Sequence, residues 1–375
     1  MQNPFRQLFR CSAGSNGESN AGALRVDPLQ GTGVIYRRFS KTGLQMPALS
    51  AGFMRAMHSW SRVAEQEIPA ASQANLEDIV RRALELGINH FETARGYGTS
   101  EEQLGRALKR IARRDSYLLQ TKIQPTDDPA AFRADFLDSL QRLGVGRVDL
   151  LALHGINDSR GLWQSCRPGG CLAMARELQR QGRAGCIGFS GHGPLPVLLA
   201  AIRHEEDGGF DYLNLHWYYI YQVNTPALAE AAARDLGVFI ISPTDKGGML
   251  QEPAAPMLDL CRPLSPMALN DLSCLARPEI QTISVGAARP TDFDAHVQAV
   301  SRLDRDGVLL QEIDCRCRQA MQAATGHARP EGLWDLLPPW DLTPGLINIP
   351  FILWLHNLAR GWGLVTYARK RYAHL

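Results

Sequence analysis

The sequence lacks a long apolar run and lacks any block of like charge. The most apolar window, Leu346 to Leu355, is interrupted by Asn348 and Pro350, whereas a membrane-spanning helix needs about 20 mostly apolar residues. Lysine and arginine total 40 against 38 aspartates and glutamates, a net charge of +2. No basic cluster of the kind that contacts a phosphate backbone stands out. We therefore expect no membrane partner and no nucleic-acid partner.

Cysteine is also sparse, with eight residues in 375. Such usage makes no disulfide framework and fits the reduced thiols of a cytoplasmic protein. Cys315 and Cys317 form a C-x-C pair, which alone is weak evidence for metal, and we predict no metal site. The first thirty residues are rich in Gly, Ser and Asn around 12–22 and have no apolar signal-peptide core. Residues 1–33 are predicted to be a disordered leader.

Short apolar segments alternate with segments of helical periodicity over most of the chain. The expected strands are 48–54, 90–93, 117–122, 148–154, 186–190, 212–216, 238–242 and 280–285. Each is followed by an expected helix: 75–86, 100–111, 132–143, 172–181, 195–204, 227–235, 268–275 and 293–303. Asn75 and Ser100 are the expected caps of the first two helices, with Gln103 completing a capping box.

This alternation predicts an α/β protein with a parallel sheet, because crossover helices bury strands on both faces. Eight such units within roughly 250 residues fit a closed (β/α)8 TIM barrel better than an open sheet. No G-x-G-x-x-G follows the first strand, so the dinucleotide fingerprint of the open fold is missing. We predict an N-terminal hairpin over 36–47, a barrel domain over 34–304, and a mainly helical C-terminal extension over 305–375 that packs on the barrel.

Ionisable residues end three successive predicted strands: Glu92, Lys122 and His154. Tyr97 follows Glu92 in the same loop, between Gly96 and Gly98. The carboxyl ends of barrel strands share one face, where the active sites of such barrels lie. These four side chains are therefore expected to meet at one mouth and to be catalytic.

Their chemistry suits proton transfer to a carbonyl oxygen. A phenol with a pKa near 10 is a weak acid at neutral pH, and a nearby ammonium would lower that pKa. A carboxylate beside Lys122 would keep it charged, and the imidazole of His154 could hold a carbonyl oxygen in line for hydride attack. A Schiff-base lyase that uses Lys122 as nucleophile is an alternative enzyme class.

Over roughly Tyr36 to Leu303 the chain resembles an aldo-keto reductase. The family's Asp-Thr-Ala-x-x-Tyr-Gly motif corresponds to 92–98, its strand-ending lysine to Lys122 and its histidine to His154. The resemblance implies that Tyr97 is the general acid/base, Lys122 modulates the pKa of Tyr97, and His154 orients the carbonyl. Glu92 stands in place of the family's aspartate, and the extra methylene changes how carboxylate and ammonium meet.

The resemblance also implies a nicotinamide cofactor, NADP in preference to NAD. Ser190 resembles the serine that holds the nicotinamide carboxamide, and Asn214 stands where the family usually has glutamine. Ile241 replaces the aromatic residue that commonly stacks on nicotinamide. The implied pyrophosphate loop comprises Ser242, Pro243, Lys246 and Gly247, and the implied adenosine-phosphate segment contains Ser284, Gly286 and Arg289. Arg289 is the expected partner of a 2′-phosphate.

After Leu303 the repeat stops, and helices are expected over 314–324, 349–359 and 362–372. This tail resembles the extension of a bacterial subgroup of the family, in which a ferredoxin-like segment can carry an iron–sulfur cluster. A cluster needs four thiolates, and no cysteine follows Cys317, so we predict no cluster. The tail's tryptophans either cover the barrel mouth or pack on its side.

The leading functional prediction is an NAD(P)H-dependent oxidoreductase that reduces a small-molecule aldehyde or ketone. The alternative from another class is a nucleotide-binding regulatory or sensing module with little turnover. Neither the substrate nor the oligomeric state follows from the sequence.

Overall fold

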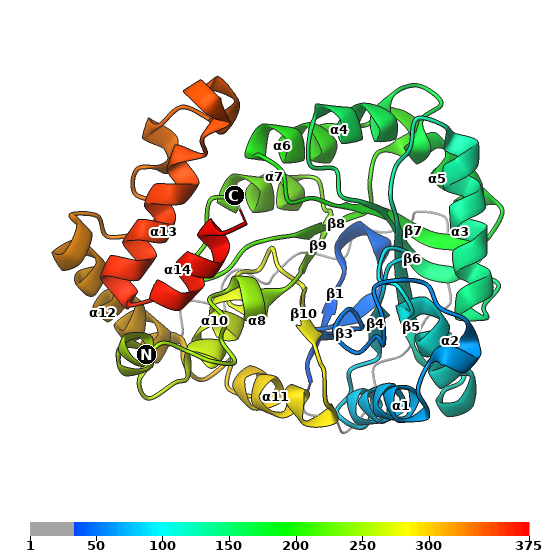
Figure 1. The fold of residues 1–375 in the computed structure, drawn as a ribbon, viewed down its shortest axis with the longest axis horizontal. Coiled ribbons are helices and arrows are strands. Elements are labelled where there is room, and N and C mark those ends of the chain that lie inside the picture. The colour runs from blue at the N-terminus through cyan, green and yellow to red at the C-terminus, as the bar shows by residue number, and fades with distance from the viewer. Residues whose placement is uncertain (1–33, 375) are drawn as a thin grey trace, which may run out of the picture.

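Eight parallel strands close into a barrel in the computed structural model, which describes residues 34–374 (Figure 1). Each strand from β3 to β9 pairs with the next along the chain, and β10 closes the ring against β3. The strands are β3 (Leu49–Gly52), β4 (His90–Glu92), β5 (Leu118–Ile123), β6 (Val148–His154), β7 (Ala184–Ser190), β8 (Tyr212–Leu215), β9 (Gly237–Ile240) and β10 (Thr282–Gly286). The predicted TIM barrel is confirmed.

Helices form the outer layer around the strands (Figure 1). They are α1 (Ala70–Glu85), α2 (Ser100–Ile111), α3 (Pro129–Leu143), α4 (Ser159–Cys166), α5 (Cys171–Arg180), α6 (Leu195–Arg203), α7 (Thr225–Ala233), α8 (Pro243–Lys246), α9 (Ala255–Cys261), α10 (Pro266–Leu275) and α11 (Asp294–Val300). The short helices α4, α8 and α9 were not expected from the sequence, because runs of four to eight residues show too few turns for periodicity.

The N-terminal hairpin closes the bottom of the barrel. Strands β1 (Tyr36–Arg38) and β2 (Gln45–Pro47) pair antiparallel, as predicted. Between them lies Phe39, which is fully buried at the N-terminal end of β9: a Cβ added to Gly237 would lie 2.7 Å from its ring. Phe39 belongs to the apolar cluster that fills the barrel interior. The opposite, carboxyl end is therefore the open mouth.

The two expected helix caps were wrong. Helix α1 begins at Ala70, and Asn75 lies inside it, where its Nδ2 donates to the carbonyl of Ala288 (2.9 Å). Helix α2 begins at Ser100 and its cap position is Thr99, so Ser100 is not the cap. The hydroxyl of Ser100 instead bonds elsewhere, to Thr93 and to the Phe53 carbonyl. Tertiary partners, which a local pattern does not show, have replaced the capping role.

Three helices follow the barrel: α12 (Gly307–Thr325), α13 (Ile349–Trp362) and α14 (Val365–Tyr372). Figure 1 shows them grouped outside the ring, with α14 next to α8. Trp354 and Trp362 are buried and donate their indole N–H groups to the carbonyls of Ile220 and Cys317, both at 2.8 Å. These two tryptophans therefore serve packing. The domain boundaries at residues 34 and 304 stay a prediction.

No helix within residues 34–374 combines the length and the apolar character needed to cross a membrane.

Candidate active site

The loop after β4 carries Tyr97 and owes its shape to one glycine. Gly98 has φ of 49°, and a Cβ at this position would lie 1.9 Å from the carbonyl oxygen of Ser59. Only glycine allows both the conformation and the approach. Gly96, on the other side of Tyr97, has open space around it and carries no such constraint. The close approach is fixed by a hydrogen bond from the Thr99 N–H to the Ser59 carbonyl (3.0 Å).

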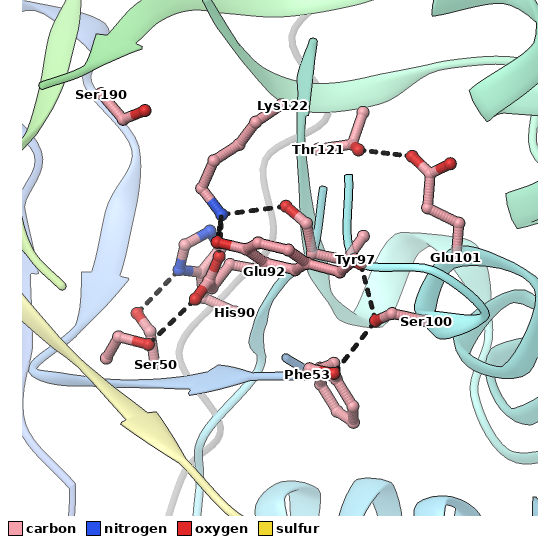
Figure 2. A network of polar contacts seen from close by, with 12 residues as sticks. Ser50, Phe53, His90, Glu92, Tyr97, Ser100, Glu101, Thr121, Lys122 and Ser190 are labelled. Carbon is pink, nitrogen blue, oxygen red and sulfur yellow. Dashed lines mark hydrogen bonds and ion pairs between the residues drawn. The ribbon is translucent and has the colours of Figure 1, made fainter. Parts of the chain in front are cut away.

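The side chain of Lys122, on β5, contacts residues of β4 and of the loop that follows it (Figure 2). Its ammonium donates to a carboxylate oxygen of Glu92 and to the carbonyl of Thr93 (3.0 Å), and it lies 3.4 Å from the Tyr97 hydroxyl. The Lys122 side chain is 1% exposed. The longer carboxylate in the aspartate position therefore does reach the lysine.

Gly52 and Ser284 make the room and the bond that Glu92 requires. Gly52 lies beside Glu92 in the register of β3 and β4, and a Cβ added to it would lie 2.7 Å from Glu92 Oε1. Ser284, on β10, donates its hydroxyl to the same Oε1 (3.1 Å). The carboxylate is thus held at both oxygens. We predicted Ser284 as a cofactor residue, and in this structure Glu92 is its hydroxyl's partner.

The electrostatics of Tyr97 differ from our expectation in net direction. Burial, the largest effect, raises the pKa of Tyr97, and the lowering by the Lys122 ammonium does not offset it. The Lys122 ammonium does lower the pKa of the phenol, as predicted. The net pKa of Tyr97 is nevertheless raised, so the expected direction of the total shift was wrong. For Lys122, burial lowers the pKa, but Glu92 and Tyr97 outweigh it and the pKa is raised. Lys122 therefore stays charged, which disfavours its use as a Schiff-base nucleophile.

His154 ends β6 and meets the ring of Tyr97 edge-on, with ring centroids 5.8 Å apart and planes at 85°. Burial, aided by the charge of Lys122, lowers the pKa of His154 to about 3. The imidazole is therefore neutral at physiological pH and has one N–H to donate. All four predicted catalytic residues thus lie together at the mouth.

A further histidine lies inside the barrel next to this group, and our sequence reading missed it. His90 precedes Glu92 by two positions on β4, so both side chains point into the barrel. Its Nδ1 hydrogen-bonds to Ser50 Oγ (2.7 Å), which also bonds to Thr282 (2.7 Å). Burial and Lys122 lower the pKa of His90 to about 3. Alternation along the strand could have pointed to it.

The opposite side of the mouth holds Ser190 and Asn214, which are paired in the register of β7 and β8. Ser190 Oγ accepts from the Gly155 N–H (3.0 Å). Asn214 is fully buried, yet neither its Nδ2 nor its Oδ1 has a hydrogen-bond partner in the described structure. An unsatisfied buried amide costs about 1–3 kcal/mol. A ligand group with both a donor and an acceptor, such as a carboxamide, fits that position.

The loop after β9 contains the predicted pyrophosphate residues. Ser242 has φ of 54° and occupies the N-cap position of the short helix α8, which begins at Pro243. A Cβ at Gly247 would lie 2.1 Å from the carbonyl of Pro243, so this turn requires glycine. Lys246 Nζ lies 3.1 Å from His216 Nε2. Burial and Arg371 lower the pKa of Lys246 to about 8. His216 and Arg371 were absent from our predicted set.

Of the predicted adenosine-phosphate residues, Ser284 lies on β10 against Glu92, Gly286 ends that strand, and Arg289 lies beyond it. The Arg289 side chain is 77% exposed and pairs with Asp292 (3.3 Å). Asp292 also accepts the backbone N–H groups of Ala288 and Arg289, at 2.8 and 3.1 Å. The carbonyl of Gly286 accepts from Arg55 (3.4 Å). Asp292 therefore already engages the amides and the guanidinium that a phosphate would use.

The cysteines of the described chain lie in different environments, and Cys261 and Cys317 hydrogen-bond to each other. Cys315 is exposed on α12 while Cys317 is buried. Among residues 34–374 no group of three or more His, Cys, Asp or Glu is placed to bind a metal ion.

A closed (β/α)8 barrel with a phenol, an ammonium and an imidazole at its mouth has its ionisable groups on the face where the active sites of barrel enzymes lie. Its family is shown by sequence: the profile of the Aldo/keto reductase family matches residues 48–291. The chain therefore belongs to the aldo/keto reductase family and is an oxidoreductase.

Individual relatives agree with this assignment. The chain is 26% identical to L-galactose dehydrogenase of Arabidopsis thaliana over 307 residues, which cover 74% of this chain and 91% of that protein. It is 30% identical to L-glyceraldehyde 3-phosphate reductase of Escherichia coli over 174 residues, which cover 42% of this chain and 46% of that protein.

Solved structures share the fold. An aldo-keto reductase of Bacillus halodurans in its holo form has a TM-score of 0.63 at 20% identity, and the match covers 76% of this chain and 96% of that one. One from Klebsiella pneumoniae, in complex with NADP and acetate, has a TM-score of 0.59 at 18% identity, covering 76% and 95%.

Proposed function

We propose that the protein reduces a carbonyl compound to an alcohol with NADPH, using Tyr97 as proton donor. The observation that carries the proposal is the placement of Lys122, whose ammonium contacts Glu92 and lies 3.4 Å from the Tyr97 hydroxyl. When bound, the reduced nicotinamide supplies a hydride to the carbonyl carbon. The carbonyl oxygen then needs one proton.

Tyr97 provides that proton. Its O–H bond breaks, the electron pair stays on the phenolate, and the proton forms the alcohol O–H bond. The raised pKa of Tyr97 keeps the phenol protonated before the reaction. The Lys122 ammonium stabilises the phenolate once it forms, because opposite charges at this distance favour the ionised phenol. Water returns the proton before the next turnover.

His154 orients the carbonyl. Its neutral imidazole, with a pKa of about 3, donates one N–H toward the substrate oxygen beside Tyr97. A charged imidazolium would compete with Tyr97 as the acid. Glu92 acts through Lys122, whose charge and position it fixes. Gly52 and Ser284 in turn position Glu92.

The chain's own residues fit a nicotinamide dinucleotide. Ser190 and the unpartnered amide of Asn214 would hold the carboxamide. Ser242, Pro243, Lys246 and Gly247 would line the pyrophosphate, and Gly286 with Arg289 the adenosine end. Arg289 supports NADP over NAD, because a guanidinium can bind a 2′-phosphate bidentately. Arg289→Ala should therefore weaken NADPH binding and leave NADH binding unchanged. Equal effects on the binding of both cofactors would contradict the proposed preference for NADP.

The substrate is proposed as a small aldehyde or ketone, in keeping with relatives named for reactions on L-galactose and L-glyceraldehyde 3-phosphate. A panel of short aldehydes, hydroxyaldehydes and sugar phosphates assayed by NADPH oxidation would define it.

The test of the proposal is Tyr97→Phe. It should reduce aldehyde-dependent NADPH oxidation by about 10²–10⁴-fold, the usual contribution of a positioned general acid, while NADPH binding is retained. Tyr117→Phe is the matched control, because Tyr117 directly precedes β5 at the closed end of the barrel and should leave turnover unchanged. Tight NADPH binding with no turnover of any carbonyl by the wild-type protein would favour a nucleotide-sensing module instead.

A further inference from the structure

The last helix of the chain lies against the loop proposed to bind pyrophosphate. The buried Tyr367 of α14 donates its hydroxyl to the carbonyl of Lys246 (2.8 Å). On the same helix, Lys370 Nζ lies 4.0 Å from Asp245 Oδ1. Figure 1 shows α14 beside α8, on the side of the ring formed by β8 and β9. The C-terminal extension is therefore part of the wall of this loop.

Positive charge outnumbers negative charge at this contact. Lys246 is half-buried, and its Nζ contacts His216 Nε2 (3.1 Å). The ring of His192 lies 4.2 Å from that of His216. Within residues 34–374 no carboxylate lies within salt-bridge distance of Lys246. The charge of its sequence neighbour Asp245 acts on Lys246, but Asp245 is exposed and also faces Lys370. A half-buried cation whose nearest carboxylate is exposed and shared would be stabilised further by an anionic ligand.

Arg371 adds a second cation from α14. Its Nε is buried and has no hydrogen-bond partner in the described part of the chain, and its guanidinium lies 5.9 Å from the centre of the Phe351 ring. Its charge acts on Lys246 and on His216, and in both cases it adds to burial in lowering the pKa. The two cations repel each other, and one of them has an unused buried donor. An anion bound next to both would relieve the repulsion and satisfy the donor.

We propose that Lys246, His216 and Arg371 form a site for a phosphate group, so that the C-terminal helix supplies one wall of the ligand-binding region. The site rests on the proposed function, because its occupant belongs to a ligand of the reductase. A phosphate there has two possible sources: the pyrophosphate of the cofactor, or the phosphate of a phosphorylated carbonyl substrate. The chemistry of recognition, two cations around one oxyanion with His216 Nε2 accepting from the Lys246 ammonium and holding it in place, is the same for both.

The first experiment measures anion binding without turnover. Inorganic pyrophosphate is titrated calorimetrically into the wild-type protein, Arg371→Ala and Arg369→Ala. Arg369 is exposed on the same helix, so its removal makes the same change in net charge. We expect Arg371→Ala to weaken binding about tenfold or more, as for a lost charged hydrogen bond, and Arg369→Ala to change it less than twofold. Equal effects of the two variants, or no binding by the wild type, would overturn the site.

Two further variants protect the test against misfolding. Arg371→Lys keeps the charge and should keep most of the affinity, whereas Lys246→Met should lose as much affinity as Arg371→Ala. Unchanged pyrophosphate binding by Lys246→Met would refute the proposal even if Arg371→Ala did not fold.

The second experiment identifies the source of the phosphate. If it is the cofactor's, Arg371→Ala should raise the Kd for NADPH about tenfold and leave the Kd for reduced nicotinamide riboside, which has no phosphate, unchanged. If it is the substrate's, the variant should raise KM for glyceraldehyde 3-phosphate and leave KM for glyceraldehyde and the Kd for NADPH unchanged. Either pattern supports the site. A wild-type protein that binds pyrophosphate through Arg371 but binds no NADPH would leave the site standing and reject the reductase.

Discussion

The two sides of the barrel mouth differ in how their polar groups are satisfied. On the side of β10 and β3 to β6, Lys122, Glu92 and Ser284 satisfy one another in a closed set of contacts. The unpartnered amide of Gln120 on this side lies deeper in the barrel, two residues before Lys122 on β5. On the side of β7 to β9, Asn214 has no partner, and Arg371 of α14 has an unused buried donor. The first side is already in the geometry that the chemistry needs. The second side is incomplete without a ligand.

This difference separates catalysis from binding in energetic terms. Groups that already satisfy one another need no reorganisation during the reaction, and such preorganisation is a large part of catalytic power. Groups left unsatisfied reduce the stability of the free protein, and the ligand that satisfies them recovers that free energy as affinity. Substitutions on the two sides should therefore have distinguishable effects on stability, affinity and turnover.

The largest expected effect is that of Lys122→Met. Turnover should fall about 10²–10⁴-fold, because the phenolate of Tyr97 loses its stabilising charge. The free energy of unfolding should also fall by about 3–5 kcal/mol, because the buried Glu92 carboxylate loses its partner. Urea unfolding and steady-state kinetics measure the two.

The double variant Lys122→Met with Glu92→Gln is the control. Removing both charges should restore most of the stability and none of the turnover. Recovery of activity in the double variant would show that the ion pair serves only the fold.

Next in size is Gly52→Ala, which should lower kcat about 10–100-fold by displacing the Glu92 carboxylate, since small misplacements near a reaction centre have effects of that order. Glu92→Asp alone should also lower kcat, because the shorter side chain no longer reaches Lys122. The double variant should recover part of the activity lost in Gly52→Ala, because aspartate removes the clash with residue 92, while the clash of the new methyl group with Ser284 Oγ (2.6 Å) remains. A double variant no better than the product of the single effects would contradict the role assigned to Gly52.

Features that depend on the local sequence pattern could be predicted. Features that depend on contacts between residues far apart in the sequence could not. The barrel, and the presence of Glu92, Tyr97, Lys122 and His154 at its mouth, followed from strands that end in phase. The fit of Glu92 could not be predicted, because it depends on Gly52 and Ser284, whose positions relative to Glu92 only the closed ring fixes. The predicted direction of the Tyr97 pKa shift was wrong for a related reason, because the burial that raises this pKa is a property of the packed structure.

The binding side was the less predictable one. Motif resemblance placed Ser190, Asn214 and Lys246 there. Arg371 comes from a helix outside the barrel repeat, and only the contact between Tyr367 and Lys246 brings it near. His216 ends the predicted strand but had no counterpart in the motif. Short elements such as α8 carry too little periodicity to be recognised.

On the binding side, Asn214→Leu should raise the Kd for NADPH about tenfold while increasing the stability of the free protein by about 1 kcal/mol. The reason is that an unsatisfied buried amide is replaced by an apolar group of similar size. Fluorescence titration and thermal unfolding without ligand measure the two effects. A loss of stability in the free protein would show that Asn214 is not an unsatisfied group.

The smallest effect concerns pH. Lys246, with a pKa of about 8 in the free protein, is charged below that pH and loses its charge above it. NADPH affinity should therefore fall above about pH 8, by at most tenfold per pH unit, and Lys246→Met should abolish that dependence. Because the pKa of His154 is about 3, kcat should show no transition near pH 6.5. Such a transition would mean that His154 titrates as an ordinary imidazole.

The most direct test of the central claim is a fluorescence titration of NADPH with the wild-type protein and Tyr97→Phe side by side, followed by addition of an aldehyde. The account predicts saturable binding with the same Kd in both proteins, and oxidation of NADPH by the wild-type protein alone. Absence of NADPH binding by the wild-type protein, or equal oxidation by both, would contradict it.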